Sequence, residues 1–145
     1  MTASAVLAVG IGCLATVEDL TRRRISNWLP VSAIVLGTAC QVFERGWRGA
    51  GSALGGTAVG LAVFLVFYLL GGMGGGDVKL MSGFGAILGP VRILEAALLT
   101  AAAGGVLAMV WLGFKAVHGR AGTGREAIPY APAITFGAWL ALFAG

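Results

Sequence analysis

Charged and chemically reactive side chains are scarce in this sequence. Only 11% of its 145 residues are charged, whereas an ordinary soluble domain has about a quarter. There is one histidine, His118, and the two cysteines, Cys13 and Cys40, have no C-x-x-C spacing. A disulfide framework and a zinc site are therefore not indicated, and a Ser–His peptidase has little to work with. The shortage of charge also excludes water as the main solvent of this chain.

Long apolar runs make up most of the rest, since 58% of the residues are hydrophobic. The runs cover Ala3–Val17, Leu29–Phe43, Leu54–Leu70, Val78–Leu88, Ile93–Val117 and Ile128–Ala144. A membrane-spanning helix needs about 20 apolar residues, which makes the fourth run short. Spanning strands would alternate apolar and polar residues, and residues 61–67 do not. We expect an all-α integral membrane protein, one domain over residues 1–145, with about six transmembrane helices.

Glycine spacing indicates close packing of these helices. Gly51 and Gly55 are four residues apart, as are Gly56 and Gly60. Small residues at this spacing let two helix backbones approach each other in a membrane.

The basic residues predict how the chain is oriented. Cytoplasmic loops of membrane proteins carry the excess of Lys and Arg. With six helices, one set of loops has seven basic residues and the other three, Arg45, Arg48 and Arg92; the larger set is Arg22, Arg23, Arg24, Lys79, Lys115, Arg120 and Arg125. This distribution places the larger set in the cytoplasm and both termini outside. The basic residues are therefore attributed to membrane orientation and not to nucleic-acid binding.

Asp19 and Asp77 are the two acidic residues most relevant to function. Each lies where an apolar run meets a loop of the cytoplasmic set. Acidic residues at membrane segments are costly and are default candidates for a functional site. Glu44 and Glu126 lie beside arginines in loops and are interpreted as solvated, and Glu95 as a partner of Arg92 or of a helix N-terminus.

A glycine-rich run, Gly71-Gly72-Met73-Gly74-Gly75-Gly76, directly precedes Asp77. So many glycines disfavour a helix, so we expect a glycine-rich loop on the cytoplasmic side before the fourth helix. Its exposed backbone would suit an extended peptide. A phosphate-binding loop would end in Gly-Lys-Ser/Thr after a strand, and this run does not. The alternative is a flexible hinge in which Asp77 caps the fourth helix.

Two carboxylates at one site favour a particular chemistry. They cannot both ionise cheaply, so one keeps a proton while the other accepts one. The ionised partner can take a proton from water, which attacks a peptide carbonyl, while the protonated partner donates to the developing oxyanion. This chemistry predicts an aspartyl peptidase that needs no metal or cofactor.

Three segments resemble motifs of the type IV prepilin peptidases, which are integral-membrane aspartyl peptidases. Asp19-Leu20-Thr21-Arg22-Arg23-Arg24-Ile25-Ser26-Asn27 is similar to their first aspartate segment, and Gly74-Gly75-Gly76-Asp77-Val78-Lys79-Leu80 to their Gly-x-Gly-Asp-x-Lys-Leu signature. Ile128-Pro129-Tyr130-Ala131-Pro132-Ala133 resembles the motif that opens their last helix. The short members that serve Flp-type pili are the most similar.

The resemblance implies roles for six residues. Asp19 and Asp77 would be the catalytic pair, and Gly74 and Gly76 the motif glycines. Lys79 would orient the loop or tune Asp77, or else only snorkel at a helix end. Glu18 would help receive a basic leader, or else be a solvated helix-end residue.

The substrate implied by the resemblance is a prepilin, which has a short basic leader ending in Gly and then an apolar helix. The cut would follow that Gly at the cytoplasmic face of the bacterial inner membrane. The sequence does not indicate which pilin is processed or the oligomeric state of the enzyme.

Two departures from the family pattern bear on these expectations. Ser26 replaces the usual Pro, which affects the rigidity of the turn but not the carboxylate. The cytoplasmic domain that long members carry between their first two helices, associated with N-methylation, is missing here. We therefore expect peptidase activity without methyltransferase activity.

Two other functions fit parts of the pattern. A small transporter or channel could use Asp19 and Asp77 to bind a cation or relay protons, and an assembly subunit could use the helices alone. Against the transporter, no paired halves are evident and both aspartates lie at one face. The assembly subunit would leave the two aspartates without a shared purpose.

Overall fold

The computed structural model describes residues 2–117 and 130–144. Its regular structure over these residues is entirely helical, which confirms the all-α class and the six helices: α1 (Ala3–Arg22), α2 (Trp28–Arg45), α3 (Trp47–Leu69), α4 (Gly75–Leu88), α5 (Pro90–Val117) and α6 (Ala131–Phe143). Some residues named in the sequence predictions lie outside the described residues, namely His118, Arg120, Arg125, Glu126, Ile128 and Pro129.

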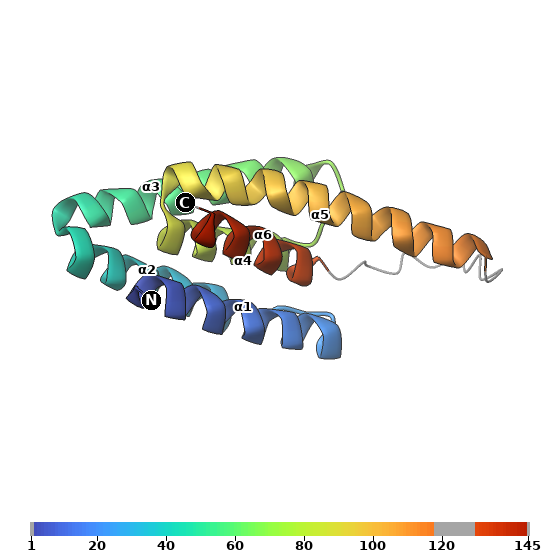
Figure 1. Ribbon diagram of the computed structural model, residues 1–145, viewed down its shortest axis with the longest axis horizontal. Coiled ribbons are helices and arrows are strands. Elements are labelled where there is room, and N and C mark those ends of the chain that lie inside the picture. The colour runs from blue at the N-terminus through green and yellow to red at the C-terminus, as the bar shows by residue number, and fades with distance from the viewer. Residues whose placement is uncertain (1, 118–129, 145) are drawn as a thin grey trace.

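Successive helices alternate in direction along the long axis of the bundle (Figure 1). The end of α1, the end of α3, the start of α4 and the start of α6 therefore lie toward the same end. The second half of α5 extends past the other helices at that end (Figure 1). This arrangement brings the segments that carry Asp19 and Asp77 to one end of the bundle.

The helices differ in their ability to cross a membrane. By length and composition, three are long and apolar enough among the described residues, namely α1, α3 and α5. Two aromatic side chains beside the α2–α3 turn are almost fully exposed: Phe43 at the end of α2 (91%) and Trp47 at the start of α3 (92%). Large aromatic side chains exposed in this way are typical of a membrane interface. The chain is therefore a membrane protein. Three of its helices are long and apolar enough to cross a membrane, fewer than the six transmembrane helices expected from the sequence.

Helix α4 is the centre of the bundle. Its 14 residues extend only about 21 Å, less than the roughly 30 Å hydrocarbon thickness. Eleven of them are buried, and Leu80, Met81 and Phe84 are completely so. The helix contacts each of the other five. The other helices therefore surround this short helix, which on its own is too short to cross a membrane.

Close contact between α3 and α4 depends on glycine. A Cβ atom added to Gly56 would collide with the backbone carbonyl of Gly85, and one added to Gly60 would lie 2.7 Å from the carbonyl oxygen of Met81. The close packing predicted from the glycine spacing is thus found at Gly56 and Gly60. The prediction was wrong for Gly51, where an added Cβ meets nothing within 4 Å.

Candidate active site

Asp19 lies one turn before the end of α1. The helix closes directly after it, because Arg23 adopts a left-handed conformation (φ 49°) and donates its N–H to the Asp19 carbonyl oxygen at 2.9 Å. The Asp19 side chain is only 8% exposed. Its Oδ2 accepts the backbone N–H of Ala131, the first residue of α6, at 3.1 Å. The carboxylate is therefore held by a helix 112 positions later in the chain.

Asp77 is the third residue of α4 and is also 8% exposed. The N-cap of α4 is Gly74, and the Gly74 backbone donates a hydrogen bond to the Asp77 carboxyl group. This is one half of a capping box. The helix thus begins earlier than expected: Gly75 and Gly76 are helical, and Asp77 is not the N-cap. The first turn tolerates glycine because the third-residue carboxyl group stabilises it.

Asp19 lies close enough to Asp77 for its charge to affect the ionisation of the Asp77 carboxyl group. Asp77 lies on α4, which is not one of the three helices long and apolar enough to span a membrane. Its pKa is raised above the usual range, first by burial and second by the negative charge of Asp19. Both effects disfavour the ionised form. The structure thus places the two predicted aspartates near enough for the charge of Asp19 to act on Asp77.

Gly76 packs the second motif against the first. A Cβ atom added at Gly76 would lie 3.3 Å from Cβ of Ile25, in the segment that follows Asp19. Such a contact is too tight for a larger residue without movement of Ile25. Gly74 is exposed, and a Cβ there would meet only the Asp77 carboxyl group, at 3.6 Å. The two glycines thus differ: Gly76 permits close packing, and Gly74 leaves exposed backbone beside Asp77.

Glu18 binds Ser26. Its carboxylate accepts the Ser26 backbone N–H at Oε2 and the Ser26 hydroxyl at Oε1, both at 3.0 Å. These bonds fix the turn between α1 and α2 immediately beside Asp19. Glu18 thus has bonded partners in this turn, and Ser26 restores some of the rigidity that the missing proline would give. A proline could not donate the backbone bond.

Lys79 also bonds to the α1–α2 turn. Its Nζ donates to Oδ1 of Asn27 at 2.9 Å, at an exposed position. The lysine thus connects α4 to the segment that follows Asp19. This contact supports the loop-orienting role over a purely snorkelling one.

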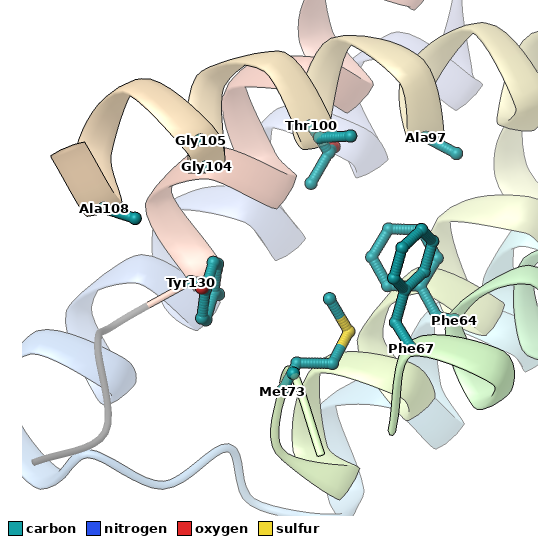
Figure 2. Close-up of a pocket in the computed structure, with 11 residues that line it drawn as sticks. Phe64, Phe67, Met73, Ala97, Thr100, Gly104, Gly105, Ala108 and Tyr130 are labelled. Atoms are coloured by element: carbon teal, nitrogen blue, oxygen red, sulfur yellow. The ribbon is translucent and has the colours of Figure 1, made fainter. Parts of the chain in front are cut away.

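An apolar pocket, which was not predicted from the sequence, is lined by Met73 and Tyr130, the residues that directly precede Gly74 and Ala131 in the chain. It has a volume of about 270 Å³ and lies between the end of α3, the segment before α4, the middle of α5 and Tyr130. Phe67, Met73 and Tyr130 project toward the same space beneath α5 (Figure 2). The small residues of α5 could have indicated this pocket, but they were interpreted from the sequence only as part of an apolar span. Among the described residues, no group of three His, Cys, Asp or Glu side chains could hold a metal ion.

Comparison with known proteins identifies the family. No curated protein and no solved structure matches the chain. A family model described as the type IV leader peptidase family matches residues 6–109, which include both aspartates and the glycine run. The chain is thus a membrane protein of the peptidase class, and it belongs to the type IV leader peptidase family.

Proposed function

We propose that this protein is a prepilin leader peptidase in which Asp19 and Asp77 form the catalytic dyad. The observation that carries the proposal is the pair of buried carboxyl groups at one end of the bundle, close enough for Asp19 to raise the pKa of Asp77. Membership of the leader peptidase family supports it. A transporter would use the same carboxyl groups, but the family is one of peptidases.

In the proposed mechanism the pair shares one proton. The ionised carboxylate accepts a proton from water as the oxygen attacks the scissile carbonyl, and the protonated carboxyl donates to the developing oxyanion. Each carboxyl receives one backbone N–H, from Ala131 for Asp19 and from Gly74 for Asp77. Each bond occupies one acceptor site of its carboxyl group and leaves the other sites for water and substrate. The exposed backbone at Gly74 gives an extended peptide a place to lie beside Asp77.

The proposed substrate is a prepilin of the Flp type, cut after the Gly that ends its basic leader. We place the site at the cytoplasmic face of the bacterial inner membrane, with both chain termini outside. The start of α1 and the end of α6 lie away from the site end of the bundle (Figure 1), which agrees with that orientation. Reporter fusions at each terminus should be active only in the periplasm; a cytoplasmic signal would contradict the orientation.

We expect no methyltransferase activity. Only residues 23–27 connect α1 to α2, so no separate domain lies between these helices. Purified protein incubated with a prepilin and labelled S-adenosylmethionine should release the leader and transfer no label. Label on the new N-terminus would overturn this part of the proposal.

The decisive experiment is cleavage of a purified prepilin by the purified protein in detergent. We expect Asp19→Asn and Asp77→Asn each to lower kcat by about 10²- to 10⁴-fold, the usual contribution of general acid–base groups. Glu44→Gln is a matched control, because Glu44 accepts a bond from Ser4 near the start of α1, away from Asp19. Retained cleavage in either aspartate variant would contradict the dyad.

A further inference from the structure

We propose that the pocket beneath α5 is the specificity site for the apolar side chain directly after the cut. This inference rests on the proposed function. The pocket is defined by Phe64, Phe67, Met73, Gly105 and Tyr130, with other small residues of α5.

Two residues that line the pocket are sequence neighbours of the two residues that bind the carboxyl groups. Met73 directly precedes Gly74, whose backbone binds Asp77. Tyr130 directly precedes Ala131, whose N–H binds Asp19. A peptide with its scissile bond at the two carboxyl groups therefore has this pocket as an adjacent apolar space.

The lining determines what kind of side chain fits. Aromatic rings and a thioether form one side, from Phe64, Phe67, Met73 and Tyr130, and α5 contributes only alanine, glycine and threonine. The residues of α5 extend from Ala97 to Ala108, which is roughly 16 Å along the helix. None of the lining residues is charged. The pocket thus suits a large uncharged side chain and disfavours the basic residues of a leader.

Only one side of the cut can supply such a side chain. The residue before the proposed cut is Gly, which has none, whereas the residue after it begins the apolar segment of the pilin. Gly104 lies beside Tyr130 at the level of the site, because a Cβ there would be 3.3 Å from the Tyr130 ring. Ala97 and Phe64 lie on the side of the pocket opposite Tyr130 (Figure 2). The pocket therefore extends in the direction that an apolar segment entering the membrane would follow.

Filling the pocket tests this assignment. Gly105 lines it, and a Cβ added there meets nothing within 4 Å, so Gly105→Leu should fold and occupy the space. Gly113→Leu is the matched control, because Gly113 is equally open, lies on the same helix and is not part of the pocket. Two prepilins are compared, with Phe or Ala directly after the cut.

For the wild type we expect kcat/KM to favour the Phe substrate by about tenfold or more, since one methylene in an apolar pocket is worth about 10- to 200-fold. Gly105→Leu should reduce that ratio to near unity by slowing the Phe substrate, and Gly113→Leu should leave it unchanged. In Met73→Ala, which enlarges the pocket, a Trp substrate should improve relative to Phe.

Other results have distinct meanings. If the wild type cleaves neither substrate, the proposed function fails. If it cleaves them with equal kcat/KM, or if Gly105→Leu slows both by the same factor, the peptidase stands and the specificity site is overturned. Loss of a co-purified lipid in Gly105→Leu, seen by native mass spectrometry with an unchanged substrate ratio, would make the pocket a lipid site and overturn the inference too.

Discussion

The surroundings of Asp19 and of Asp77 are built in different ways. Asp19 is on a long apolar helix and is held by α6, far away in the chain. Asp77 is on a short enclosed helix and is held by Gly74, three residues earlier. The two aspartates nevertheless have the same exposed fraction, 8%. The difference shows that one carboxyl depends on how the bundle is assembled, and the other depends on the first turn of its own helix and on the packing of that helix.

The largest effect on folding is expected where α4 packs against α3. Gly56→Ala places a methyl group against the Gly85 carbonyl, and overpacking of this kind costs about 1–3 kcal/mol. Thermal unfolding in detergent should show it, with Gly51→Ala as the control because that position is open. Equal stability of the two variants would mean that α4 does not depend on this contact, and the enclosed setting of Asp77 would need another explanation.

The next-largest effect on stability is expected to distinguish the Ala131–Asp19 hydrogen bond from the Gly74–Asp77 hydrogen bond. Asp19→Leu leaves the N–H of buried Ala131 without its acceptor, which costs about 1–3 kcal/mol, whereas Asp19→Asn keeps an acceptor. Asp77→Leu should differ less from Asp77→Asn, because exposed Gly74 can donate to water instead. The measurement is the unfolding free energy of all four variants. An equal Leu–Asn difference at both positions would remove the distinction between the two carboxyl sites.

A smaller effect is expected at the turn after Asp19. Glu18→Ala removes the acceptor of both Ser26 bonds and should lower kcat about three- to tenfold, within the range of coupling seen between bonded residues. In a Ser26→Pro background the same change should matter less, because proline supplies rigidity without that acceptor. A larger loss in the proline background would show that Glu18 acts on substrate and not through Ser26.

The smallest effect is expected at Lys79. Its bond to Asn27 is exposed, and exposed polar contacts contribute about 1 kcal/mol or less. Lys79→Met should lower kcat a few-fold, and Lys79→Arg should restore most of it. A much larger loss in both variants, with unchanged stability, would indicate direct contact with substrate.

The sequence predicted the parts of the site that are local. The helix class, the number of helices and the two aspartates followed from apolar runs, scarce charge and short motifs. The start of α4 was misplaced, because glycine propensity disfavours a helix and the capping bond from Gly74 to Asp77 depends on three-dimensional geometry. The bond from Ala131 could not be predicted, since it requires knowing that the start of α6 meets the end of α1.

The pocket and the Glu18–Ser26 contact show the same limit. Ser26 was interpreted as the loss of a proline, because a motif compares positions and not the bonds they form. The small residues of α5 follow no pattern that separates a pocket wall from a lipid-facing surface. Only the packing of Met73 and Tyr130 near them distinguishes the two.

The central claim is that Asp19 and Asp77 act as one unit, and a double-variant cycle tests it most directly. Rates of prepilin cleavage are measured for wild type, Asp19→Asn, Asp77→Asn and the double variant, each verified as folded by its unfolding profile. Groups that act together lose most of their contribution when either is removed, so we predict that the double variant is about as slow as the slower single variant. Losses that multiply in the double variant, or a single variant that retains wild-type cleavage, would contradict the account.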